Sequence, residues 1–403
     1  MSKSTFFTGQ PIFNQLLYLI PRESVSRLVR ELDTDRYYKK FKTYDHLVTM
    51  LFTSFYGCKS LREVTTGMMV VHNKLQHLGL HYIPRRSTLA DANACRSEDF
   101  FARLYHKLYQ RYYGDLPDSR LSGGIERYLF IMDSTTIKLF SDIMKGAGAK
   151  PANGKSKGGA KAHVLMKADE DVPRLVCISH ASKNDRLLMH KFNLPAGSII
   201  VFDKGYINYD KYTEWHQQGV MWVGRLGNAA SLRVDQQREV SPQSASHGIL
   251  SDEIITLGRP SNHKDMPIAV RKICLYDAAT KKELTFITNN TEVAPEMIAD
   301  IYKRRWQIEL LFKRIKQSYP LRYFLGDNEN AIKIQIWCAL IADLLVKIIK
   351  DRIRRKWSYA NISSMIRLHL MTYVNLIEFL NNPDMALRLY DQSENQQQLG
   401  LFT

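Results

Sequence analysis

The sequence predicts a mixed α/β protein that is preceded by an all-helical N-terminal region. Up to about residue 120, apolar residues recur at helical spacing and no strand-like run occurs. From residue 127 onward, compact apolar runs typical of strands alternate with short helical segments. Two long helices, at about 295–317 and 329–354, follow the last strand-like run. The order of elements along the chain is typical of a mixed α/β fold: a strand is followed by a hairpin, a helix and a further strand, and helices come last.

The N-terminal region, residues 1–122, is expected to form a helical domain. Its most periodic segments are "PIFNQLLYLI", "SVSRLVREL", "YDHLVTMLFTSFYG" and "DFFARLYHKLYQRYY". Breaks are expected at Pro21, Gly57, Pro84 and Gly114, because proline and glycine interrupt helices. A short helix is also expected over "RRSTLADANACRS", residues 85–97, with Ser87 as its N-cap.

Residues 123–225 are predicted to form the first part of the α/β core. One apolar strand, in "RYLFIMDSTTIKLF", is expected to end at Asp133, and a second, in "GSIIVFDKGYIN", to end at Asp203. Between them, "AHVLMKA" and "RLVCISHAS" are predicted to pair as a hairpin across the acidic turn "DEDVP". The helical segment "YDKYTEWHQQG" and the strand "VMWVGRL" complete this part.

Residues 226–289 are predicted to form a β-rich insertion that closes with the strand "LTFITNN", because short apolar runs alternate with polar turns there. Residues 290–355 return to the core with two long helices, and residues 356–403 form a helical tail. The apolar run "IWCALIADLLVKII" contains Asp343 and Lys347 and is too short for a membrane span, so it predicts a buried helix.

The amino-acid composition indicates which class of binding partner the protein has. Hydrophobic residues make up 45% and charged residues 24%, as in ordinary globular proteins, but the formal net charge is +17. Such an excess favours a polyanionic partner, nucleic acid before an anionic membrane. The alternative is a merely basic soluble protein. The helix at 85–97 could then be presented to DNA or be one more bundle helix. The five cysteines are scattered, which favours a reducing cytoplasm over disulfides or zinc.

Two of the predicted strands end in the same way, with an acid at the exit. Asp133 follows "FIM" and Asp203 follows "IIVF". Ligands gather at the carboxyl ends of strands in open α/β sheets, so the two carboxylates share one crevice if the strands are neighbours. Two such close carboxylates need cations, and oxygen ligands of this kind favour Mg²⁺ or Mn²⁺. The alternative is that each aspartate only caps a turn.

The segment "IYKRRWQIELLFKRIKQ", residues 301–317, predicts one continuous helix with six cationic side chains and a single acid, Glu309. At about 100° per residue, one face of that helix carries Tyr302, Arg305, Glu309 and Lys316. We expect Glu309 to be the third metal ligand and the cations to bind phosphates, since guanidinium groups suit bidentate phosphate contact.

These residues resemble the insertion-sequence-four (IS-four) family of DDE transposases. The spacing of Tyr302, Arg305, Glu309 and Lys316 matches the Y-R-E-K signature of that family. "MDSTTI" and "DKGY" place their aspartates where the family has its first and second acids, and "WVGRL" resembles the strand that follows. The resemblance covers roughly residues 125–350. It implies an RNase H-like catalytic core with a β-rich insertion between the second aspartate and the glutamate.

The resemblance also implies an activity. The protein would cut transposon ends and join them to target DNA by phosphoryl transfer, with two Mg²⁺ or Mn²⁺ ions held by Asp133, Asp203 and Glu309. The expected partner is double-stranded DNA, as terminal inverted repeats and as target, bound by a homodimer in the cytoplasm and nucleoid without any membrane. The expected DNA contacts are Tyr302, Arg305, Lys316, Lys313 and Arg225.

Several alternatives remain at the level of sequence. The chain could be an RNase H-like nuclease that does not join strands, or a DNA-binding regulator without catalysis. "AKPANGKS" (149–156) resembles a nucleotide-binding loop but lacks the first glycine, so a basic loop on DNA phosphate or a solvated connection is favoured. Trp306 could stack on an extruded base, although packing in the core is the preferred interpretation.

Overall fold

The computed structural model describes residues 9–112, 114, 128–138, 159–180, 189–227, 230–258 and 266–388 of the 403-residue chain. The chain divides into two compact units. We call them the helical unit (Met1–Leu116, Ile137–Gly159 and Lys313–Thr403) and the sheet unit (Pro117–Thr136 and Ala160–Phe312). The loop "AKPANGKS" lies outside the described residues.

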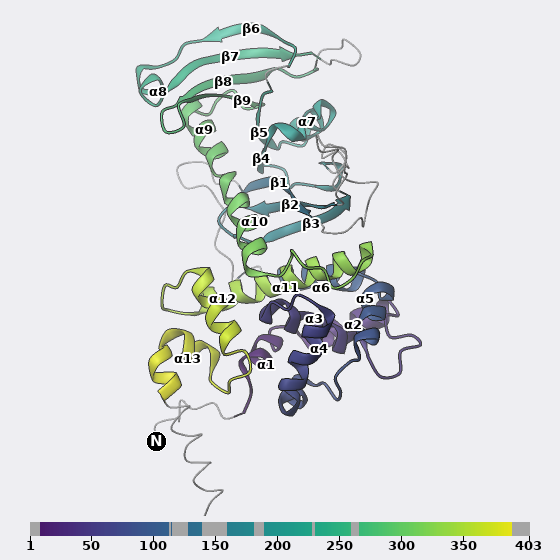
Figure 1. Ribbon diagram of the computed structural model, residues 1–403. Coiled ribbons are helices and arrows are strands. Elements are labelled where there is room, and N and C mark those ends of the chain that lie inside the picture. Colours follow the sequence, from purple (N-terminus) through teal and green to yellow (C-terminus); the bar gives the residue numbers. More distant parts are fainter. Residues whose placement is uncertain are drawn as a thin grey trace, which may run out of the picture. The chain divides into compact units, whose positions relative to one another are not determined.

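The helical unit is built around one long buried helix, α11 (Glu329–Arg352). The described helices of this unit are α1 (Ile12–Leu17), α2 (Arg22–Glu31), α3 (Thr43–Tyr56), α4 (Leu61–Val70), η1 (His72–Leu78), α5 (Arg86–Cys95), α6 (Asp99–Tyr112), α11, α12 (Tyr359–Leu368) and α13 (Leu376–Asn381). Helix α11 packs against α3, α5, α6 and α12 (Figure 1), and its side chains are buried from Ala331 to Ile349 with few exceptions. A helix that is apolar on most sides must be covered by others, which explains the bundle.

Two details of the helical unit follow from single residues. Gly57 ends α3 with a φ of +74°, a conformation that is costly for residues with a Cβ atom. Asp343, buried in α11, receives two hydrogen bonds from Arg314 at 3.0 and 2.8 Å, which compensates its desolvation. Among the helices that the structure describes, none combines the length and apolarity needed to cross a membrane.

The predicted N-cap of the helix at 85–97 is wrong by two positions. Helix α5 begins at Arg86, and its N-cap residue is Arg85, which makes no side-chain capping hydrogen bond. Ser87 therefore lies inside the first turn.

The sheet unit holds one continuous mixed sheet. Its described elements are β1 (Leu129–Lys138), β2 (Gly159–Lys167), β3 (Pro173–His180), β4 (Ile199–Phe202), η5 (Lys204–Tyr206), α7 (Tyr209–Gln217), β5 (Met221–Arg225), β6 (Leu232–Arg238), α8 (Pro242–Ser246), β7 (Ile249–Leu257), β8 (Val270–Asp277), β9 (Lys282–Thr288) and α9 (Pro295–Lys303). The strand order is β3-β2-β1-β4-β5-β9-β8-β7-β6. Strands β1, β4 and β5 run parallel, whereas β2–β3 and the series β5-β9-β8-β7-β6 are antiparallel. The predicted mixed α/β class and N-terminal helices are confirmed.

The two faces of the central strands pack against different helices, α7 and α9, on either side of β4 and β5 (Figure 1). Side chains alternate between the faces of a strand. Phe202 and Trp222 point to the face that α7 covers, where Tyr212 stacks on both rings at centroid distances of 5.1 and 4.6 Å. On the α9 face, Tyr302 packs on Phe286 at 4.9 Å. One face of the central strands is therefore held by an aromatic cluster.

Two local predictions are corrected. Strand β1 does not end at Asp133 but continues to Lys138, so the acid lies within a strand. The helix predicted over 301–317 is broken into α9 and α10 (Trp306–Ser318) by a turn at Arg304 and Arg305. There the backbone hydrogen bonds span three residues, from Arg305 to Tyr302 and from Ile308 to Arg305, which tightens the chain locally. No glycine or proline marks this turn in the sequence.

Gly224→Ala should destabilise the sheet unit. A Cβ atom at Gly224 would lie 2.5 Å from the ring of Phe202, its register partner on the neighbouring strand, and that ring is held by the aromatic cluster. Overpacking of this kind costs about 1–3 kcal/mol, which urea denaturation would measure. Gly227→Ala is the matched control, because a Cβ atom there meets nothing within 4 Å. Equal stability of the two variants would contradict the tight contact.

Candidate active site

Asp133 and Asp203 lie side by side because their strands are parallel neighbours in register. Met132 is paired with Phe202, so the aspartate that follows each of them occupies the next position of its strand. Each acid also lies two residues after a side chain of the α9 face, Ile131 or Val201, and therefore points to that face. The prediction that the two strands are neighbours is confirmed.

Arg305 connects the first acid to the third. One terminal nitrogen donates to Asp133 Oδ2 at 2.8 Å, and the other donates to Glu309 Oε1 at 2.6 Å. The side chains of Arg305 and Asp133 are only 13% and 17% exposed, so water screens these charges poorly. The Nε atom of Arg305 is buried without a hydrogen-bond partner. The Arg305 guanidinium group thus bridges two carboxylates of this site.

Tyr302 holds the second acid. Its hydroxyl group donates to Asp203 Oδ1 at 3.1 Å, and the Arg305 guanidinium lies 5.7 Å from its ring. Burial raises the pKa of Tyr302 above its ordinary value, and the charge of Asp203 raises it further, so the phenol is a neutral donor. The nearby charge of Arg225 opposes this rise in the pKa of Tyr302, which places that side chain in the same electrostatic environment.

Burial also sets the charge state of Asp133. It raises the pKa of this carboxyl from 3.8 to about 6. The backbone hydrogen bond from Ser134 and the charge of Arg305 oppose the rise in the pKa of Asp133, while Asp203 and Glu309 add to it. The pKa of Arg305 is itself raised: burial lowers it, but the hydrogen bond to Glu309 and the surrounding negative charges outweigh burial.

The donor set suits a hard divalent cation. Asp133, Asp203 and Glu309 offer carboxylate oxygens, the ligand type that Mg²⁺ and Mn²⁺ prefer. When ionised, three acids beside one guanidinium leave an excess of negative charge. In the part of the chain that the structure describes, however, no three His, Cys, Asp or Glu side chains are grouped closely enough to hold a metal ion. The three carboxylates are therefore of the right ligand type for such an ion. In the present arrangement, however, the Arg305 guanidinium and not an ion neutralises Asp133 and Glu309.

A contact that the sequence did not reveal fixes the start of α10. The turn between β2 and β3 carries Asp169, whose carboxylate accepts from Arg304 at 3.1 Å and from Gln307 at 2.9 Å. Its backbone N–H in turn donates to the Gln307 side chain at 3.0 Å. The acidic turn "DEDVP" was the available signal, but 135 residues separate it from Arg304. This contact orients the turn that carries Arg305.

The surplus of cations in residues 301–317 has a partly structural explanation. Lys303 pairs with Asp300, Arg304 with Asp169, and Arg314 with Asp343. Lys313 and Lys316 are exposed on the second half of α10, which is counted with the helical unit. The preferred interpretation of Trp306 as a core residue is wrong, because its side chain is 58% exposed.

Comparison with known proteins matches the segment that carries these acids. The family model described as "Transposase DDE domain" matches residues 124–345, more than half of the chain. The chain belongs to the DDE transposase family. It is a DNA transposase, an enzyme of metal-dependent DNA cleavage and transposition. A second family model, a domain of unknown function named DUF4372, matches residues 8–81.

Two relatives with similar sequences agree with this assignment. The transposase is 34% identical over 266 residues to y4zB of Sinorhizobium fredii, described as a transposase, across 66% of this chain and 71% of that one. It is 23% identical over 229 residues to a transposase described for the insertion sequence element IS5377 of Geobacillus stearothermophilus, across 57% and 58% of the two chains. A structural alignment with piggyBac transposase, in a synaptic complex with hairpin DNA, covers 97% and 83% of the chains with 11% identity and a TM-score of 0.44.

The stability of Asp133→Asn relative to the wild type should be higher at about pH 8 than at about pH 5. Because the folded-state pKa of Asp133 is raised to about 6, wild-type stability falls as pH rises through that value and a buried carboxyl must ionise. Asparagine has no proton to lose, so the free energy of unfolding of the variant relative to the wild type should rise by about 1 kcal/mol between the two pH values. Urea denaturation in the presence of EDTA measures it. A similar gain in Asp300→Asn, on the exposed side of α9, would contradict the role of burial.

Proposed function

We propose that Asp133, Asp203 and Glu309 are the catalytic acids with which this transposase cuts insertion-sequence ends and joins them to target DNA. The observation that carries the proposal is the Arg305 bridge between Asp133 and Glu309, with Asp203 at the register position next to Asp133. Three acids from β1, the end of β4 and α10 share one electrostatic environment. An ion pair that only stabilised the fold would need one acid beside Arg305 and would not require two further acids nearby.

The sheet supports an RNase H-like core. In the order β3-β2-β1-β4-β5, a hairpin strand precedes three parallel strands, and β6 to β9 extend the sheet from β5. We infer that residues 123–225 and 290–355 form this core, that 226–289 is an insertion, that 1–122 binds DNA ends and that 356–403 is a helical tail.

The acids would hold two Mg²⁺ or Mn²⁺ ions, which when bound would supply Lewis acidity for activating a water molecule or a DNA 3′-hydroxyl and for stabilising the leaving oxygen. Before that, Arg305 neutralises Asp133 and Glu309 and keeps them at one place. Once released from the carboxylates, its guanidinium is free to bind a phosphate. Tyr302 keeps Asp203 oriented through one oxygen and leaves the other for a ligand.

The DNA contacts are proposed from the same arrangement. Arg225 lies at the end of β5 near Tyr302, and Lys313 and Lys316 follow Glu309 along α10. Double-stranded DNA with terminal inverted repeats, paired by a homodimer in the nucleoid, is the substrate that we propose. Phosphate contacts of this kind set position rather than sequence.

Glu309→Gln should abolish cleavage of terminal-repeat DNA and retain DNA binding, because the amide keeps the shape but not the charge that a divalent ion requires. With labelled terminal DNA, a target plasmid and Mg²⁺, the expected loss is at least about a thousandfold in rate. Glu283→Gln, exposed on β9 of the same unit, is the matched control and should act like wild type.

The products of the wild-type protein separate the alternatives. Joined products support the proposal, whereas nicks without joining indicate an RNase H-like nuclease. A mobility shift without cleavage indicates a DNA-binding regulator. Unchanged cleavage by Glu309→Gln would remove that residue from the site.

Arg305→Ala should bind Mn²⁺ more tightly than the wild type in the absence of DNA. The substitution removes the guanidinium that competes for Asp133 and Glu309, an effect of about 1 kcal/mol or about fivefold in affinity at moderate exposure. Isothermal titration calorimetry at about pH 8, where Asp133 is ionised, measures it. Arg304→Ala, which removes a neighbouring guanidinium paired with Asp169, should leave the affinity unchanged. Weaker Mn²⁺ binding by Arg305→Ala would contradict the competition.

A further inference from the structure

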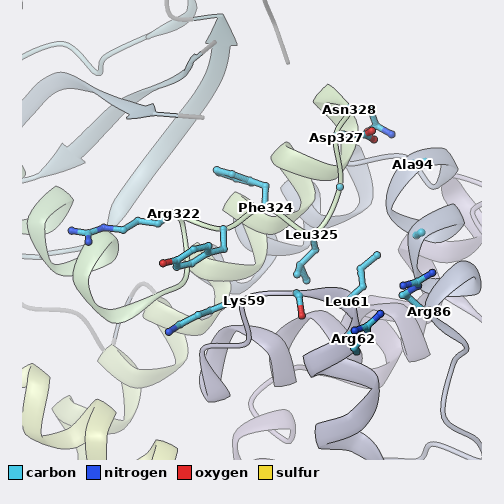
Figure 2. Close-up of a pocket in the computed structure, with 14 residues that line it drawn as sticks. Lys59, Leu61, Arg62, Arg86, Ala94, Arg322, Phe324, Leu325, Asp327 and Asn328 are labelled. Carbon is cyan, nitrogen blue, oxygen red and sulfur yellow. The ribbon is translucent and has the colours of Figure 1, made fainter. Parts of the chain in front are cut away.

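The helical unit contains a cleft that the active site does not use. Its volume is about 810 Å³, large enough for a ligand the size of a nucleotide or more. Three segments line it: residues 59–62 at the start of α4, one side of α5, and residues 322–328 between α10 and α11 (Figure 2). We call it the basic cleft, and its full lining is Lys59, Ser60, Leu61, Arg62, Arg86, Ala90, Ala94, Arg322, Tyr323, Phe324, Leu325, Gly326, Asp327 and Asn328.

Four exposed cations mark its rim. In Figure 2, Arg62 and Arg86 lie at one end of the lining and Lys59 and Arg322 at the other. Within the described part of the chain, none of the four forms an ion pair with an acid. This differs from most cations of residues 301–317, which have acidic partners. The lining contains a single acid, Asp327. Unpaired positive charge around a hollow favours a polyanionic ligand.

The floor of the basic cleft is apolar. Leu61 and Leu325 lie between the two pairs of cations (Figure 2), and alanines of α5 line the hollow beside them. Tyr323 also lines the cleft with 45% of its surface exposed, and the Lys59 ammonium lies 5.7 Å from its ring. An aromatic ring and an apolar floor next to cations are the features by which proteins bind single-stranded nucleic acid.

The start of α5 adds a weaker contribution. Its N-cap residue, Arg85, makes no side-chain capping hydrogen bond, and its first turn contains no acid. The partial positive charge at this helix end is therefore not neutralised locally. It adds to the charge of Arg86 at the same place.

We propose that the basic cleft holds an unpaired stretch of a DNA strand, with phosphates on its cations and a base on Tyr323 and the apolar floor. The proposal rests on the proposed function, which makes DNA the substrate, and extends it to the helical unit. Duplex phosphates need only a charged surface, whereas a hollow with an apolar floor and an exposed ring suits an unstacked base. The positive charge, the volume and the apolar floor of the basic cleft thus all fit an unpaired DNA strand.

The charge contribution is tested by salt dependence. The probe is a fluorescent mixed-sequence DNA single strand of about 20 nucleotides, bound to the full-length protein at several salt concentrations. Each phosphate contact contributes about 0.7 to the slope of log K against log salt for a single strand. Arg62→Ala/Arg86→Ala should lower the slope by about 1.4 and Arg62→Lys/Arg86→Lys should retain it.

The matched control is Arg27→Ala/Arg30→Ala, which removes the same charge from the exposed side of α2 in the same unit. If the control lowers the slope of log K against log salt by the same amount, the proposal for the basic cleft is wrong, because the effect then reflects the net charge of the protein and not the cleft. All the substituted side chains are exposed, and circular dichroism verifies that each variant is folded.

The base contribution is tested at Tyr323. Tyr323→Ala should weaken binding of the single strand about fivefold or more, and Tyr323→Phe should retain it, because stacking needs the ring and not the hydroxyl group. The same DNA as a duplex should be affected less by Tyr323→Ala. An equal or larger loss for the duplex would overturn the proposal.

The outcome is separable from that of the proposed function. Cleavage of terminal-repeat DNA with Mg²⁺ is measured on the same preparations. If the cleft variants bind the DNA single strand as tightly as the wild type does, the proposal for the basic cleft is wrong, even when Glu309→Gln behaves as expected. Loss of single-strand binding in the cleft variants supports the cleft, even when wild-type protein gives no joined products.

Discussion

The ion-pair bridge from Asp133 through Arg305 to Glu309 is the interaction on which the candidate active site depends. Burial of carboxylates is costly unless cations and hydrogen bonds compensate it. Here one guanidinium satisfies oxygens of two acids that are 176 residues apart in the chain, because Arg305 lies 172 positions from Asp133 and four from Glu309. Without that cation, the pKa of Asp133 would lie further above its ordinary value.

The sheet makes this bridge possible through register and side-chain alternation. Parallel pairing of β1 with β4 places the two aspartates at adjacent positions on one face. The opposite face is fixed by stacked rings, in which Phe202, the residue before Asp203, lies against Tyr212. The chain thus uses apolar packing on one face to position charges on the other. Rigid elements of this kind hold reacting groups better than loops do.

The cationic side chains of the protein fall into two groups, those paired with acids inside the fold and those without an acidic partner among the described residues. Arg304 and Arg314 are paired with Asp169 and Asp343, so their charge orients helices. The cations of the basic cleft have no acidic partner among the described residues, and their charge remains available to a ligand. Net charge alone does not separate these uses, because both kinds of cation count equally toward +17. The distinction depends on which acids the fold brings near.

The sequence by itself determined the strand that carries Asp133, the strand that precedes Asp203, the long buried helix near residue 340 and the mixed α/β class. These features depend on local periodicity and on residue type, which neighbours in the chain encode. Only the tertiary structure decided that Arg305 and Tyr302 contact the acids, that Asp169 fixes the start of α10, that the helix breaks at Arg304 and that Trp306 is exposed. The contacts of Tyr302, Arg304 and Arg305 with Asp203, Asp169 and Asp133 join residues that are 99, 135 and 172 positions apart. The helix break and the exposure of Trp306 depend on packing around a turn. Neither kind of feature leaves a periodic signal in the chain.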